Sequence, residues 1–280
     1  MEADRRRAIR PTNPDDVRLV QRPDSEDPCD GYGVIEWHAA WGNGWPLTGW
    51  LPAIEEPGLF YKIARGIRGD SVADLHRGGE GVAADALEAF RRFGPLLYDH
   101  ESFWESPRRG EGFILEERVY DWGYNAARMR HARDLYRALD DARYGAFEKI
   151  AGIVGQHATP DELIREGEQK LVEWINSSLR DTVYIELQPV ADAGRVIRED
   201  RAAVRLAYAP RNLLGSAWLM FAREVVGETV IAECDNCHTF FSRDADRARA
   251  NMRFCSDKCR NRAWVRDNRK GKHAEESKGE

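Results

Sequence analysis

Apolar residues in this chain recur mainly at helical spacing, and only short segments alternate between apolar and polar positions. Intervals of three and four residues place apolar side chains on one face of a helix. They predict helices over five stretches: 59–64, 86–93, 118–155, 159–178 and 210–227. Gly94-Pro95 is a stop signal for the second helix, and Thr159-Pro160 is a start signal for the fourth, with Thr159 as its N-cap.

Alternating segments predict a few short strands among these helices. The expected strands are 17–20, 32–37, 183–189 and 204–208, with a small hairpin formed by 230–233 and 239–241. A returning strand is expected at Arg253-Phe254, ahead of a final helix that begins at Cys255 or Ser256. The fold class that follows is mainly α with small β elements (α+β).

Charge is distributed unevenly along the chain. Residues 243–272 hold 11 Lys or Arg and 4 Asp or Glu, a net charge of +7. The whole chain carries −6, so the remainder sums to −13. A basic segment on an acidic body indicates a polyanionic partner more clearly than the overall pI of 5.8 does.

Four cysteines stand in two close pairs, one just before the basic segment and one inside it. Cys234 and Cys237 have the spacing of a turn, and Cys255 and Cys259 have helical spacing. Two such pairs, separated by 17 residues, suit a tetrahedral Zn²⁺ ion with thiolate ligands. Four thiolates leave no open coordination position, which favours a structural metal over a catalytic one.

Disulfide bonds and an iron–sulfur cluster account for the cysteines less well. A disulfide framework needs an oxidising compartment, and the charged start Met1–Arg7 has no apolar signal segment behind it. An iron–sulfur cluster has no support from the spacing. The fifth cysteine, Cys29, is expected to be a free thiol, and a cytoplasmic location is expected for the protein.

The sequence around the second pair resembles the bacterial CGNR-type zinc finger. Arg253-Phe254-Cys255-Ser256 followed by Cys259-Arg260-Asn261-Arg262 carries the resemblance, which covers about residues 229–268. Arg260 stands where that family has Gly. The resemblance implies a mostly helical, ABATE-like N-terminal domain and a role as a bacterial transcription regulator. The expected order of cysteine turn, hairpin and helix with the second cysteine pair describes a treble-clef-like finger.

These observations predict four regions. They are a flexible arm (1–30), a helical ABATE-like domain (31–228), a four-cysteine zinc finger (229–270) and a disordered tail (271–280). The metal ligands are expected to be Cys234, Cys237, Cys255 and Cys259.

The cations of the finger are candidates for phosphate binding. The candidates are Arg243, Arg247, Arg249, Arg260, Arg262, Arg266, Arg269 and Lys270. Some cations near the cysteines, Lys258 among them, can instead offset the formal charge of −2 on a zinc tetrathiolate. Asn261 can read a base edge or brace the fold, and the bracing role is the favoured interpretation.

The resulting hypothesis is a zinc-dependent DNA-binding transcription regulator, with RNA left open as the polymer. The alternative is a non-enzymatic adaptor whose finger docks a protein partner, and association with a second copy is also open. No catalytic motif is present in the sequence, so an enzyme is not expected. The Trp-rich segment 37–50 packs as a lid on the helices or lines an effector pocket.

No run of about 18 apolar residues occurs, so no membrane span is expected.

Overall fold

The computed structural model describes residues 17–20, 34–39, 58–67, 80–93, 96–97, 113–142, 144–145, 147–155, 159–189, 204–244 and 252–276. Contacts divide the chain into two compact units. The first unit comprises Met1–Glu55 and Leu59–Leu219, and the second comprises Glu56–Gly58 and Met220–Glu280. Helices and small antiparallel sheets both occur, which confirms the predicted mixture of α and β elements.

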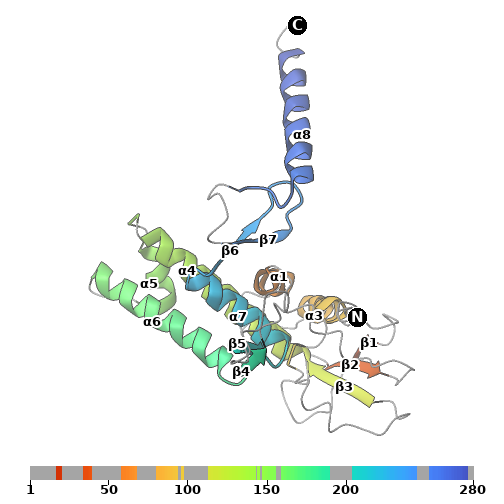
Figure 1. Cartoon of the computed structure of the whole chain (residues 1–280), viewed down its shortest axis with the longest axis vertical. Helices are drawn as coiled ribbons and strands as arrows, with labels where there is room; N and C mark the ends of the chain where they lie inside the picture. The colour runs from red at the N-terminus through yellow and green to blue at the C-terminus, as the bar shows by residue number, and fades with distance from the viewer. Residues whose placement is uncertain are drawn as a thin grey trace, which may run out of the picture. The chain divides into compact units, whose positions relative to one another are not determined.

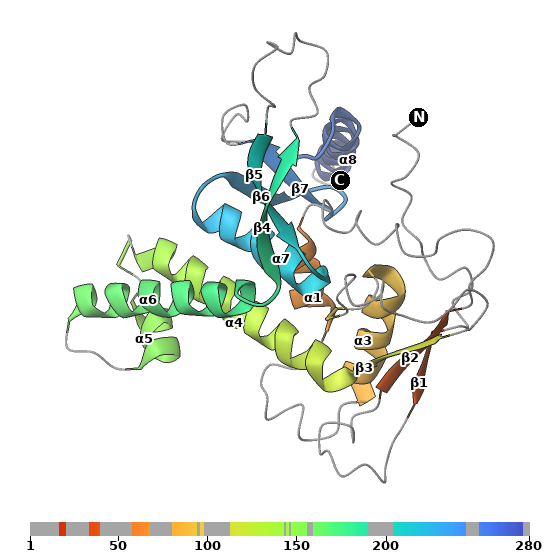
Figure 2. The same cartoon turned by 60° about the horizontal axis from the view of Figure 1, so that its bottom comes forward.

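Helices carry most of the core of the first unit (Figure 1). They are α1 (Leu59–Gly66), α3 (Glu80–Phe93), α4 (Val119–Ala142), α5 (Glu148–Val154) and α6 (Pro160–Leu179), with the first residues of α7 (Leu213–Val225). Figure 2 shows α5 and α6 lying against α4. The largest fully buried side chains are Trp122 of α4 and Trp218 of α7, and the Trp218 ring meets Phe60 edge to face.

Two antiparallel sheets belong to the first unit. Strands β1 (Val17–Val20), β2 (Val34–Ala39) and β3 (Phe113–Arg118) form one sheet in that order. Strands β4 (Val183–Pro189) and β5 (Val204–Pro210) form the other. The strand predicted at 17–20 and the hairpin predicted at 183–189 and 204–208 are therefore confirmed.

A buried carboxylate joins β3 to the helical core. Glu117 is 7% exposed and accepts hydrogen bonds from the backbone N–H groups of Leu96 and Leu97, at 2.8 and 2.6 Å. Its third donor is the Trp122 indole Nε1, at 2.9 Å. Three donors compensate a carboxylate for its loss of water, so Glu117 fixes the segment after α3 against α4.

The helix predicted over 118–155 begins as expected, at Val119, but it is wrong in its continuity, because it divides between Ala142 and Glu148. The residues just before it, 113–118, form β3, which the apolar pattern did not predict. Gly145, with φ +90°, lies at the break. Only glycine adopts this backbone conformation freely, and the reversal lets α5 fold back on α4 and α6.

The start of α6 follows its sequence signal closely. The Thr159 side chain accepts a hydrogen bond from the backbone N–H of Glu162, and the Glu162 carboxylate accepts from the backbone N–H of Thr159. This reciprocal capping box uses two donors that would otherwise lack a partner, and it confirms the predicted N-cap.

The second unit contains a hairpin and a long helix besides the end of α7. Strands β6 (Thr229–Glu233) and β7 (Phe240–Asp244) pair antiparallel, with Glu233 opposite Phe240. Helix α8 runs from Asp257 to Glu276. The predicted hairpin is present, but Arg253-Phe254 is not a strand. The backbone O of Arg253 accepts a hydrogen bond from the backbone N–H of Asp235 (3.0 Å).

Two predictions for the ends of the chain meet the structure only in part. Helix α8 continues through residues 271–276, which were expected to belong to a disordered tail, because Lys, Ala and Glu are good helix formers. Apart from 17–20, the arm 1–30 lies outside the described residues, as does most of the Trp-rich segment 37–50.

Candidate metal centre

The first cysteine pair lies on the turn that joins β6 to β7. Backbone hydrogen bonds from Cys234 N to Thr239 O (3.1 Å) and from His238 N to Cys234 O (2.9 Å) close this turn. His238 has φ +56°, the left-handed conformation that reverses the chain just after Cys237. The turn therefore directs both sulfurs to the same side.

The second pair lies at the start of α8. Cys255 precedes the helix, and Cys259 is in its first turn. Ser256 acts as the N-cap, because its Oγ accepts a hydrogen bond from the backbone N–H of Cys259 at 3.3 Å. The prediction that the two sulfurs lie together is confirmed. The capped start of the helix brings them together, whereas the spacing had suggested that both lie on one face of a helix.

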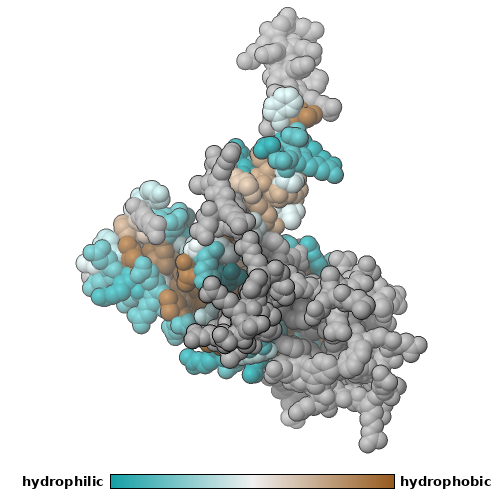
Figure 3. Space-filling model, viewed as in Figure 1, coloured by the Kyte–Doolittle hydropathy of each residue, from teal (hydrophilic) through white to brown (hydrophobic). Residues whose placement is uncertain are grey.

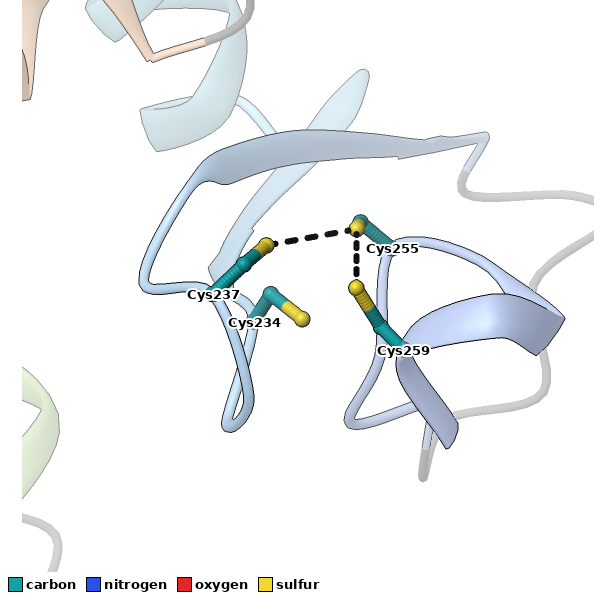
Figure 4. Close-up of side chains that lie close together, drawn as sticks. All are labelled: Cys234, Cys237, Cys255 and Cys259. Carbon is teal, nitrogen blue, oxygen red and sulfur yellow. Dashed lines mark hydrogen bonds between the residues drawn. The ribbon is translucent and has the colours of Figure 1, made fainter. Parts of the chain in front are cut away.

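All four sulfurs converge on one point (Figure 4). The Sγ atoms lie within 4.8 Å of one another, and both Cys237–Cys255 and Cys255–Cys259 are separated by 3.6 Å. Four Zn–S bonds of about 2.3 Å at tetrahedral angles require sulfur separations of about 3.8 Å. The cysteines are free thiols, and these separations exceed the roughly 2.05 Å of a disulfide bond. The spacing thus fits a metal ion.

The four cysteines differ in their access to solvent. Cys234 and Cys259 are buried and form, with Phe241, the small apolar cluster of this unit, while Cys255 is half-buried and Cys237 is exposed. Two of the cysteines therefore belong to the interior of the unit and two lie toward its surface.

Hydrogen bonding to sulfur favours the thiolate form of the first pair. Burial acts to raise the pKa of the Cys234 thiol. The backbone N–H groups of Cys255, Cys237 and Asn236 outweigh burial and lower the pKa from 9.0 to about 6. Thr239 lowers the pKa of Cys237 through its side chain and its backbone. The turn thus supplies two thiols prepared to bind a cation.

Cys255 shows the opposite behaviour. The adjacent Cys259 sulfur, together with burial, raises the pKa of Cys255 from 9.0 to about 12. Several thiolates so close together repel one another, and a divalent cation removes this repulsion. The repulsion between the thiolates and the distances between the sulfurs therefore lead to the same conclusion: the site can hold a metal ion with four sulfur ligands.

Polar pairs surround the cluster and line an open cleft of about 580 Å³. Arg253 pairs with Asp235 at 2.6 Å, His238 Nδ1 lies 3.2 Å from Glu233, and Arg266 donates to Asn236 at 3.5 Å. These contacts tie the turn, the segment before α8 and α8 itself together. His238 is thus engaged with a carboxylate and does not complete the sulfur cluster.

The predicted phosphate-binding cations are placed in three groups. Exposed side chains on α8 belong to Arg260, Arg262 and Arg266. Three more lie in described elements by their backbone: Arg243 in β7, and Arg269 and Lys270 in α8. Two lie outside the described residues: Arg247 and Arg249.

Two further residues of α8 differ from what the sequence pattern predicted. Asn261 was expected to brace the fold, but it is exposed and its side chain makes no hydrogen bond to any described residue. Trp264, for which the sequence pattern indicated no role, has a side chain that is 68% exposed. Cys259 and Ala263 are buried, and the helical register against them puts positions 261 and 264 on the solvent side. The sequence pattern alone does not show which residues of this helix are buried.

No family model, curated protein or solved structure matches this chain. Among the described residues, no helix has the length and apolar character that crossing a membrane requires.

Proposed function

We propose that Cys234, Cys237, Cys255 and Cys259 hold one structural Zn²⁺ ion in a treble-clef-like finger. The donor set supports zinc, because four thiolates in a closed site suit a redox-inert, tetrahedral ion. The ion supplies two positive charges and a cross-link between the β6–β7 turn and the start of α8. Elemental analysis of purified protein is expected to give one zinc per chain, and a metal-free but folded second unit would refute this proposal.

We further propose that the second unit binds nucleic acid, with DNA as the expected polymer, and that the protein is a transcription regulator. The observation that supports this most is a row of exposed cations on α8. Residues 257–266 hold four Lys or Arg and one Asp. Lys258 and Arg262 are exposed and make no ion pair with any described residue. Two cations of this kind, next to Arg260 and Arg266 on the same exposed helix, suit phosphate groups.

The helix geometry makes these two cations available together. Lys258 and Arg262 are four residues apart, so they lie on one side of α8, about 6 Å apart along its axis. Cys259 and Ala263 are buried on a different side. A metal that fixes Cys259 would therefore also fix the direction in which the cations point.

The resemblance to the CGNR-type family supports the choice of a regulator over the adaptor alternative. In that hypothesis the first unit, an ABATE-like domain, senses an effector or mediates association. The regulator and the adaptor differ in what the cations do, so charge reversal distinguishes them.

Lys258→Glu with Arg262→Glu, in the zinc-loaded full chain, tests the proposal. Fluorescence anisotropy with labelled DNA is measured from 50 to 300 mM salt. The wild type is expected to lose affinity steeply with salt, and the double variant is expected to bind weakly, with its log–log salt slope reduced by about two.

The matched control is Arg137→Glu with Arg165→Glu. These residues are exposed on α4 and α6 of the first unit, and the same change in net charge is made there. This control should bind like the wild type. Equal loss in both double variants would indicate a net-charge effect only, and no loss in either would favour the adaptor.

A further inference from the structure

A large aromatic side chain on α8 is exposed beside the cations. Trp264 is 68% exposed, whereas Trp122 and Trp218 of the first unit are fully buried. Trp264 makes no ring or cation contact with any described residue. Tryptophan exposes a large apolar surface at a cost in free energy, so its position on a polar helix requires an explanation.

The neighbours of Trp264 on the helix are polar or cationic. At about 100° per residue, Arg260 and Asn261 are the nearest preceding residues on the same side of α8. The Asn261 side chain has no hydrogen-bond partner among the described residues, and Arg260 pairs with Asp257 at 3.0 Å on the surface. The Trp264 ring thus stands next to an amide and a guanidinium group.

The apolar surface here is small. Val265, 41% exposed, is the other large exposed apolar residue in the described part of α8. In Figure 3, hydrophilic residues lie beside a small, less polar area on this helix. Protein-binding hot spots lie in well-packed apolar surroundings, which this helix lacks. Charge complementarity favours an anionic occupant with a flat apolar face.

A nucleotide with an unpaired base has this chemistry. Its phosphate is anionic, its base offers a π-face to an indole ring, and its edge carries donors and acceptors that an amide can match. In a duplex, base faces are stacked on one another and are inaccessible to Trp264. An exposed ring of this kind would therefore distinguish single-stranded from double-stranded nucleic acid.

We propose that Trp264 stacks on an unpaired nucleobase while the α8 cations hold the adjoining phosphates, so that the second unit prefers single strands to duplex. This inference rests on the proposed nucleic-acid binding and specifies its target: melted DNA or an unpaired segment of RNA. Asn261 lies where it can hydrogen-bond the edge of the stacked base.

The test compares three labelled probes of one sequence: a 12-nucleotide DNA strand, the same RNA strand, and the DNA duplex. Dissociation constants are measured by anisotropy with the zinc-loaded full chain. Trp264→Ala is expected to weaken single-strand binding about 5- to 150-fold, which corresponds to the 1–3 kcal/mol of one stacked base. Duplex binding should change less than about twofold. The two single-stranded probes show whether DNA or RNA is the better ligand.

Three variants serve as controls. Trp264→Phe keeps an aromatic ring and should retain most of the single-strand affinity. Val265→Ala removes the neighbouring apolar side chain and should change nothing. Lys258→Gln with Arg262→Gln should weaken all three probes alike. Zinc content and far-UV circular dichroism are measured for each variant to verify folding.

The outcomes separate this inference from the proposed function. Duplex binding that needs Lys258 and Arg262, with single-strand binding unaffected by Trp264→Ala, keeps the proposed function and overturns the inference. Absence of binding to every probe overturns both. A 12-residue polyglutamate peptide that displaces the single strand from wild type and Trp264→Ala equally well would show that charge alone drives binding, and would also overturn the inference.

Discussion

The two units of this protein are stabilised by different means. The first buries large apolar side chains from several helices, with Trp122, Trp218 and Phe60 fully excluded from solvent. The apolar cluster around the cysteines of the second has three buried members, and two of them, Cys234 and Cys259, are candidate metal ligands. A cluster this small supplies little hydrophobic stabilisation.

From this comparison we expect metal binding and folding to be one process in the second unit, and metal binding to be separate from the folding of the first unit. If a metal ion stabilises the second unit, the unit needs few buried apolar side chains, and its surface residues can be charged. This explains how α8 carries many exposed cations and still has a fixed position at its first turn. Four experiments can contradict or refine this contrast.

Metal removal should have the largest effect. Structural zinc contributes about 10–16 kcal/mol of apparent binding free energy in small fingers. A strong chelator, or Cys259→Ser, is expected to abolish hydrogen-exchange protection in β6, β7 and the start of α8. Protection of α4 and α6 should persist in the same sample.

Cys29→Ser is the matched control for Cys259→Ser. It removes a thiol of the same size far from the cluster in sequence and should leave metal content and protection unchanged. Retained protection of the β6–β7 hairpin in the chelated protein would contradict the contrast between the units.

Truncation of Trp122 should have the next largest effect, confined to the first unit. Trp122→Ala leaves a cavity and deprives Glu117 of one of its three donors, so we expect a loss of about 3–5 kcal/mol in the free energy of unfolding. Urea unfolding followed by circular dichroism measures this loss, and elemental analysis should still find the metal. Loss of zinc in this variant would show that the units depend on each other.

Two glycines offer a smaller, paired test within the first unit. A Cβ at Gly215 of α7 would lie 2.3 Å from the backbone oxygen of Thr182, whereas a Cβ at Gly152 of α5 would meet nothing within 4 Å. Gly215→Ala is expected to destabilise the unit by about 1–3 kcal/mol, and Gly152→Ala to stabilise it by up to about 1 kcal/mol. Thermal denaturation of both variants measures the difference, and equal shifts would contradict this packing.

A change in pH should have the smallest effect, a gradual decrease in the metal affinity of the second unit as the pH falls. At pH 7, Cys255, with a pKa of about 12 before metal binding, carries a proton that the metal must displace, while Cys234, with a pKa of about 6, is already mostly thiolate. Each displaced proton lowers apparent metal affinity about tenfold per unit fall in pH. Competition with a chromophoric chelator at pH 6, 7 and 8 should show a slope of at least one, and a flat profile would argue against thiolate ligation.

Local signals in the sequence predicted local features well. Thr159 and Glu162 form their capping box because all the atoms involved lie within one helical turn. The turn between Cys234 and Cys237 closes through hydrogen bonds between residues at most five apart. Such interactions need no distant partner, so the sequence alone specifies them.

Features that depend on distant partners were missed. Strand β3 does not alternate, since Phe113-Ile-Leu precedes Glu116-Glu-Arg, and it forms because β2 supplies its hydrogen bonds. The break at Gly145 depends on the packing of α5 against α4 and α6, which lie elsewhere in the sequence. The exposure of Asn261 and Trp264 follows from the burial of Cys259 and Ala263, which the sequence pattern does not contain.

By itself, the sequence determined most of the helices and strands, where the strongest cap lies and which four sulfurs belong together, because these depend on spacing along a short stretch of chain. Only the tertiary structure decided that the sulfurs lie 3.6 Å apart in neighbouring pairs, that Glu117 is buried among three donors, and which side of α8 faces solvent. The physical reason is that burial and electrostatic repulsion are set by groups distant in sequence, whose positions a local pattern does not contain.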